Sequence, residues 1–186
     1  MIIKKLSWLP AVIIMGLIFS FSATPAEISG ESSLEISRTI VKIYEQVTDI
    51  QIESADRSRT LEQMDHIVRK TAHFMEYAAL AAAIAFHFIL SAGRSLSTEG
   101  NRSAEDNRSK EGADKAFRAR RLGVSFLIAS LYAATDEFHQ TFVPGRSGQL
   151  SDVILDSCGA AAGVILFALL LYIIDKVRNR PVHRIK

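Results

Sequence analysis

The sequence predicts an all-α membrane protein, with four transmembrane helices packed as a bundle and an extracytoplasmic amphipathic helix. Three observations support this fold class. The apolar residues of the 186-residue chain are concentrated in four blocks, each near the roughly 20 residues that a helix needs to cross hydrocarbon. Polar segments separate the blocks, and their lysines and arginines are unevenly distributed. Ionisable residues also interrupt the apolar blocks, where charge is costly and usually retained for a function.

Each block is expected to form one spanning helix. The four spans are residues 6–21, 66–90, 122–142 and 153–174. A cleaved signal peptide is the alternative for the first block. It is disfavoured because Phe21 would lie at the third position before a cleavage after Ala23, where a small residue is expected.

Residues 23–65 are expected to form an extracytoplasmic segment that contains an amphipathic helix. Ser32 and Glu35 resemble the capping box that begins a helix. Apolar residues then recur at steps of three and four on one face; they are Ile36, Ile40, Ile43, Val47 and Ile50. Such a helix could lie on the membrane face, cover the mouth of the bundle, or simply pack over the loop, and the sequence leaves these alternatives open.

Residues 91–121 are expected to form a disordered cytoplasmic loop. The stretch is rich in Ser, Arg, Glu, Gly and Asp, with almost no apolar residues between Ser97 and Ala116. A segment of this composition buries too little apolar surface to fold.

The lysines and arginines orient the bundle. They are concentrated in the amino terminus, in the 91–121 loop and in the tail that follows the last span, whereas residues 23–65 are acidic and the 144–151 loop has only Arg146. The positive-inside rule places the basic segments in the cytoplasm. We therefore expect a multi-pass protein with both termini cytoplasmic.

This topology brings polar stripes on the last three spans to a similar depth, toward the outer leaflet. Because lipid-facing charge is disfavoured, the stripes should turn inward and form one site, where Arg69 and Lys70 can pair with Asp136, Glu137 or Asp156. The candidate ligand-binding residues are Arg69, Lys70, His73, Tyr77, Asp136, Glu137, Gln140, Arg146, Asp152 and Asp156.

Catalytic roles stay unassigned. His73 or His139 could act as a general base oriented by Asp136 or Glu137. The same acids and histidines could hold a divalent metal, but the chain has no zinc-ligand spacing, Walker loop or dinucleotide-binding glycine pattern, and we assign no metal and no cofactor.

Other partners are constrained by charge and by small residues. The formal net charge of +2, with basic residues in loops and tails, argues against nucleic acid. A single cysteine, Cys158, excludes an intrachain disulfide. Gly159 and Gly163 form a pair that permits close helix approach within the bundle, and a homodimer through them is left open.

The order and spacing of these residues resemble the VanZ-like family of small membrane proteins. The resemblance rests on Arg69-Lys70-x-x-His73-x-x-x-Tyr77, Asp136-Glu137-x-x-Gln140-x-Phe142-x-Pro144-Gly145-Arg146 and Asp152-Val153-x-x-Asp156-x-x-Gly159-x-x-x-Gly163. The Phe19-Ser20-Phe21-Ser22 end of the first span also looks like the family. Asp156 departs from the asparagine that the family often has there, and the long 91–121 insertion looks atypical.

The resemblance implies a bacterial cytoplasmic-membrane protein of the cell envelope, and the family's founding member is associated with low-level resistance to the antibiotic teicoplanin. A family name supplies no reaction, so the site must carry the functional argument. The preferred hypothesis is that the site binds or modulates a lipid, a lipid-linked envelope precursor or a lipoglycopeptide, with cationic side chains meeting phosphate. The alternatives are an intramembrane hydrolase or transferase acting on such a lipid, and an ion-pair network with a purely structural role.

Overall fold

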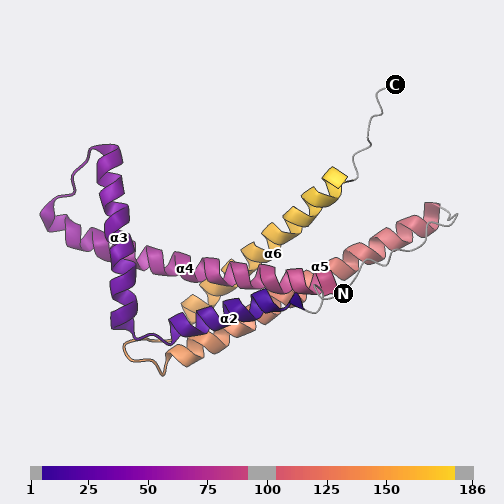
Figure 1. Ribbon diagram of the computed structural model, residues 1–186, viewed down its shortest axis with the longest axis horizontal. Helices are drawn as coiled ribbons and strands as arrows, with labels where there is room; N and C mark the ends of the chain where they lie inside the picture. The colour runs from indigo at the N-terminus through magenta and orange to yellow at the C-terminus, as the bar shows by residue number, and fades with distance from the viewer. Residues whose placement is uncertain (1–5, 92–103, 179–186) are drawn as a thin grey trace.

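The computed structural model describes residues 6–91 and 104–178, and its regular elements there are five α-helices (Figure 1). They are α2 (Leu9–Ser22), α3 (Ala26–Thr48), α4 (Ser54–Ser91), α5 (Ala104–Gln140) and α6 (Leu150–Arg178). The predicted all-α fold class is confirmed.

Two of these helices are long and apolar enough to cross a membrane: α4, from Ala55 to Ser91, and α6. A third candidate arises only if α2 and α3 count as one span, and they meet at 105°. Alone, α2 has 14 residues, fewer than the roughly 20 of a typical crossing. The apolar part of α5 ends in Asp136 and Glu137, which lower its hydropathy. The four predicted spans are therefore only partly confirmed.

The predicted disordered loop over residues 91–121 is wrong in its second part, because residues 104–121 are helical and lead into the apolar part of α5. Residues 92–103 lie outside the described part of the chain. The prediction counted apolar residues and overlooked alanines, lysines and arginines, which favour helix. Residues 104–121 also make a tertiary contact, since Arg118 Nη1 lies 2.7 Å from Asp175 Oδ2 of α6.

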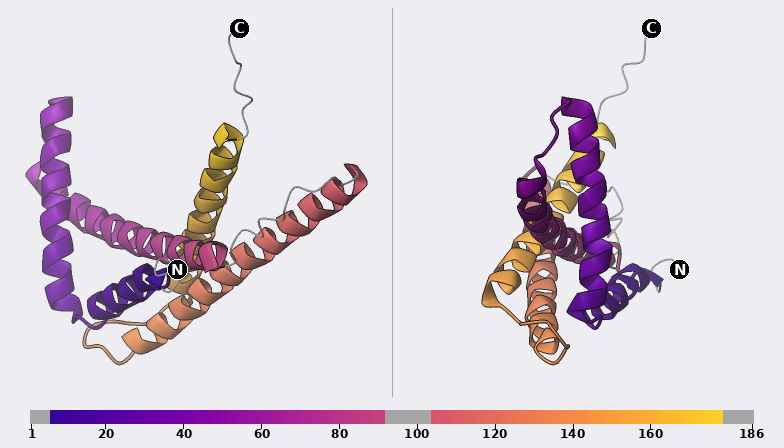
Figure 2. Two further views of the ribbon diagram at one scale, coloured as in Figure 1. Left: turned by 45° about the vertical axis from the view of Figure 1, so that its right-hand side comes forward. Right: turned by 90° about the vertical axis from the view of Figure 1, so that its left-hand side faces the viewer.

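The predicted helix in residues 23–65 exists as α3, but it starts earlier than the capping box suggested. Pro25 occupies the N-cap position and Ser32 lies inside the helix. Proline is well suited to the start of a helix, because it has no backbone N–H to leave unpaired. In Figures 1 and 2, α3 stands across the direction of α2 and α4.

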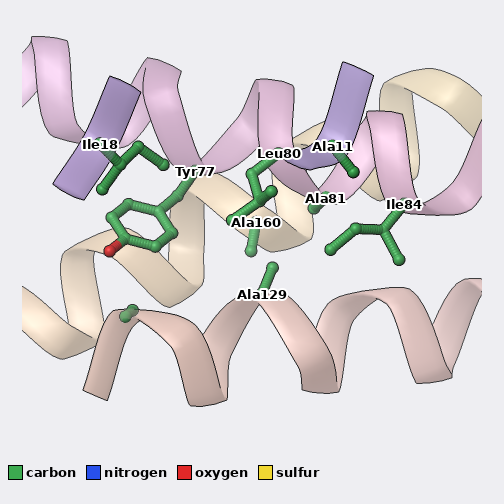
Figure 3. Packing of buried hydrophobic residues seen from close by; sticks show 9 residues of the cluster. Ala11, Ile18, Tyr77, Leu80, Ala81, Ile84, Ala129 and Ala160 are labelled. Carbon is green, nitrogen blue, oxygen red and sulfur yellow. The ribbon is translucent and has the colours of Figure 1, made fainter. Parts of the chain in front are cut away.

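The apolar core of the bundle lies where α2, α4, α5 and α6 meet (Figure 3). Its buried members are Ala11, Ile18, Tyr77, Leu80, Ala81, Ile84, Ala129, Ala133 and Ala160. Five of these nine are alanines, so the helices approach closely. The central helix is α4, which contacts α2, α3, α5 and α6.

The closest approach joins α6 to α4. A Cβ atom at Gly159 would collide with the backbone carbonyl of Phe74, and one at Gly163 with that of Ala78. The small pair therefore packs within the bundle, as predicted. This contact also covers the face on which a homodimer was left open.

Candidate functional site

Buried polar side chains gather at one end of the bundle, where α2 and α5 end and α6 begins. We call this region the polar end. It is formed by Ser22, Tyr77, Asp136, Glu137, Gln140 and Asp156, each at most 6% exposed. Tyr77 of α4 and Asp156 of α6 thus lie buried at this end together with the three residues of α5, and α2 contributes Ser22.

Asp136 is the centre of the hydrogen bonding. Ser22 Oγ donates to its Oδ2 at 2.8 Å, and Gln140 Nε2 donates to the same oxygen at 3.2 Å. Ser22 was missed as a site residue. The sequence pointed to Ser22 through its position in the Phe19-Ser20-Phe21-Ser22 motif, at the end of the first span. That end must lie beside the end of the third span, which carries Asp136.

Glu137 anchors the loop that precedes α6. Its Oε2 accepts a hydrogen bond from the backbone N–H of Gln149 at 3.0 Å. At Gly148 an added Cβ would collide with the backbone carbonyl of Glu137 and lie 2.7 Å from Thr141 Cγ2. The loop therefore packs directly on the last turns of α5.

Arg146 closes the polar end. Its Nε donates to the carbonyl oxygen of Thr24 at 2.9 Å, and its Nη2 donates to that of Phe21 and to Ser29 Oγ, both at 3.0 Å. Burial lowers the pKa of this guanidinium, and the nearby Asp136 acts in the opposite direction. Arg146 thus holds its loop against the junction of α2 and α3. From the sequence, this side chain was instead expected to bind phosphate.

The basic residues of α4 pair differently from the expectation. Lys70 Nζ lies 2.5 Å from Asp152 Oδ1 of α6. Arg69 Nη2 lies 2.9 Å from Asp65 Oδ2 on its own helix, and Asp65 accepts a hydrogen bond from Ser33 Oγ of α3. Lys70 therefore joins the predicted group through Asp152, whereas Arg69 is paired on the side of α3.

Several buried polar atoms in the described part of the chain have no hydrogen-bond partner. At the polar end they include His73 Nδ1, His139 Nδ1 and both carboxyl oxygens of Asp156. His139 lies against Phe19, with ring centroids 4.7 Å apart. Neither histidine is thus hydrogen-bonded through Nδ1 to Asp136 or Glu137, as an oriented general base would be.

Beside the polar end lies an open groove between α4 and α6, with a volume of about 300 Å³. It is lined by His66, Ile67, Lys70, Thr71, Phe74 and Leu155. Most of its surface is apolar, and Lys70 connects it to the pair with Asp152. Within residues 6–91 and 104–178, no three acidic, histidine or cysteine side chains are placed to hold a metal ion.

The exposed surface of the bundle is strongly apolar. On α6 it includes Ile165, Leu166, Leu169, Leu170 and Ile173, each about half exposed or more. Continuous apolar surface of this extent marks contact with a membrane. The fold and the buried polar end therefore define a helical membrane protein.

A family model described as VanZ/LLP1 matches residues 7–171, which is most of the chain. The chain belongs to this family, and the predicted resemblance is confirmed. Neither a curated protein nor a solved structure is similar enough to match.

Proposed function

We propose that this VanZ/LLP1 protein binds an amphiphilic molecule of the bacterial cell envelope at the outer leaflet of the cytoplasmic membrane. The candidates are a lipid, a lipid-linked envelope precursor or a lipoglycopeptide such as teicoplanin, and modulation of such a molecule would link the protein to antibiotic resistance. The observation that carries the proposal is the apolar groove between α4 and α6, with Lys70 at its wall.

The groove and the polar end suit the two parts of an amphiphile. Ile67, Phe74 and Leu155 offer apolar contact to an acyl or prenyl chain. Lys70 offers a compact cation to phosphate. Its pairing with Asp152 keeps the ammonium partnered when no anion is bound. The unpartnered carboxyl oxygens of Asp156 offer acceptors to hydroxyl or amino groups of the ligand.

The proposed orientation keeps both termini in the cytoplasm and the polar end outside. It is supported by basic residues at the opposite end of the bundle, where α6 ends with Lys176 and Arg178. Arg118 and Arg121 precede the apolar part of α5 on the same side. These positions agree with four crossings, in which α2 and the second half of α5 also span the membrane.

The alternatives are less well supported. A purely structural network accounts for the hydrogen bonds of Asp136, Glu137 and Arg146, but leaves the groove and the unpartnered carboxyl oxygens of Asp156 without a role. An enzyme needs an oriented base, and the Nδ1 atoms of His73 and His139 have no partner. Binding is therefore the preferred function.

Native mass spectrometry of the purified full-length chain tests the proposal with phosphatidylglycerol, phosphatidylethanolamine and a polyprenyl phosphate as probes. We expect saturable retention of one of them. Thr71→Trp should fill the groove and Lys70→Gln should remove its cation, each weakening retention about tenfold or more. Arg69→Gln is the matched control, because Arg69 pairs with Asp65 and does not line the groove. The absence of saturable retention, or an equal loss in the control, would refute the proposal, and chemical conversion of a probe would favour the enzyme.

A further inference from the structure

Helix α3 is buried on its polar side. The residues that face α4 from α3 are Ser33, Ser37, Val41 and Glu45, all at most 7% exposed. Three of these four are polar. Ser33 Oγ and Glu45 Oε1 are hydrogen-bonded to Asp65 and Arg57 of α4, at 2.5 and 2.9 Å.

The apolar stripe of the same helix is exposed. Its exposed fractions are 52% at Ile36, 38% at Ile40, 53% at Ile43 and 79% at Val47. With about 100° per residue, the stripe lies about 110° around the helix from the buried face. The stripe therefore neither packs on α4 nor points directly away from it, and none of the described helices covers it.

A third face carries charge. Glu31, Glu35, Arg38 and Lys42 are exposed, and they lie about 110° from the buried face in the opposite sense. The contact with α4 therefore has an apolar flank on one side and a charged flank on the other. This arrangement is typical of a helix that rests at a boundary between hydrocarbon and water.

The direction of α3 matches such a boundary. It leaves α2 at 105° after only three connecting residues, and in Figures 1 and 2 it crosses α4 steeply. If α2 and α4 stand across a membrane, α3 lies near the membrane plane. The two flanks of its contact face then point along the bundle axis, one toward hydrocarbon and the other away.

We propose that α3 is an in-plane membrane helix whose apolar stripe inserts into the lipid leaflet at the polar end of the bundle. Exposed apolar side chains also lie at the end of α2 that leads into α3, where Phe19 and Phe21 are 50% and 57% exposed. Lipid already covers such side chains along a spanning helix. The charged flank has two acids and two bases, so the binding depends on apolar insertion and requires no anionic headgroup.

This placement has a consequence for the polar end. Ser29 and Ser33 of α3 are hydrogen-bonded to Arg146 and Asp65. An inserted α3 thereby fixes one wall of the polar end relative to the lipid surface. The inference concerns the membrane contact alone and stands whether or not the groove binds a ligand.

Spin labels on the full chain test the insertion. In a Cys158→Ser background, single cysteines replace Ile43 and Val47 on the stripe, and Arg38 and Lys42 on the charged flank. The chain is placed in nanodiscs of zwitterionic phosphatidylcholine. We expect labels on the stripe to be more accessible to oxygen than to a water-soluble nickel chelate, at a depth of about 5–10 Å, and labels on the charged flank to show the reverse.

Three outcomes would overturn the inference. If labels on the stripe are as accessible to the nickel chelate as labels on the charged flank, the stripe lies in water. A stripe shielded from both reagents would mean that protein, such as a second copy, covers it. Adding phosphatidylglycerol should leave the depth unchanged, and insertion only with the anionic lipid would contradict the apolar mechanism. Lipid retention in the groove is measured separately, so the two proposals fail independently.

Discussion

The apolar core and the polar end are equally buried but are held together differently. Leu80, Ala81 and Ala160 in the core are completely buried, as is Asp156 at the polar end. The core consists of small and apolar side chains that need no partners. The polar end has hydrogen bonds at Asp136, Glu137 and Arg146, yet both oxygens of Asp156 are without one. A buried carboxyl without a partner does not stabilise the fold. Asp156 is therefore expected to have a functional role.

The largest effect is expected in the close contact between α6 and α4. Gly163→Ala places a methyl group against the backbone carbonyl of Ala78, which cannot move aside as a side chain can. We expect a loss of about 3 kcal/mol of stability, seen as a lower midpoint of thermal unfolding in detergent.

Gly123→Ala on α5 is the matched control, because a Cβ atom added there would have no other atom within 4 Å. Alanine there should stabilise the helix by about 0.5–1 kcal/mol through reduced backbone freedom. If both variants shift the midpoint equally, the contact between α6 and α4 does not limit the stability of the core.

The sequence predicted the packing of α6 better than the partners of the charged residues at the polar end. Helical periodicity and the spacing of Gly159 and Gly163 are local, so they identified α6 and its packing. The partners of the charged residues depend on tertiary geometry. Arg146 faces the carbonyl oxygens at the end of α2, and Arg69 lies on the side of α3; neither orientation follows from spacing along the chain. The same limitation applies to residues 104–121, whose helix is supported by the rest of α5 and by the contact with α6.

The second effect tests whether the polar end is held by Asp136. Asp136→Ala removes the acceptor of Ser22 Oγ and Gln140 Nε2, both buried. We expect a loss of about 2 kcal/mol, since buried donors that lose a charged acceptor are left unpaired. Asp114→Ala, at an exposed position of the same helix, should change the unfolding midpoint little. A neutral result for Asp136→Ala would mean that these hydrogen bonds do not hold the polar end together.

A third substitution should have the opposite sign. Asp156→Asn replaces a buried carboxyl that has no partner by an uncharged amide of the same shape. We expect stability to rise by about 1 kcal/mol while lipid retention weakens, which is the usual trade-off at a functional site. A loss of stability comparable to that of Asp136→Ala would show that Asp156 holds the polar end together, and would remove it from the proposed binding site.

The smallest effect is expected at Glu45, where the polar side of α3 meets α4. Its Oε1 accepts a hydrogen bond from the backbone N–H of Ile52 at 3.2 Å, and its two oxygens meet the guanidinium of Arg57 at 2.9 and 3.2 Å. The hydrogen bond from Ile52 lowers the pKa of Glu45 below its usual 4.5, Arg57 contributes in the same direction, and burial opposes both. Because the pKa is lower in the folded protein, the stabilisation is complete above the unfolded value and is lost as the pH falls through the folded one.

Hydrogen exchange in the turn between α3 and α4 measures this loss. We expect the turn around Ile52 to exchange faster in Glu45→Gln than in the natural chain at neutral pH, and the difference to shrink below a pH of about 4.5. Glu35→Gln, on the exposed charged flank of α3, should show no such difference. If Glu45→Gln and the natural chain exchange equally fast at neutral pH, the shape of the side chain, and not its charge, holds α3 on α4. The contact would then resemble the apolar core more than the polar end.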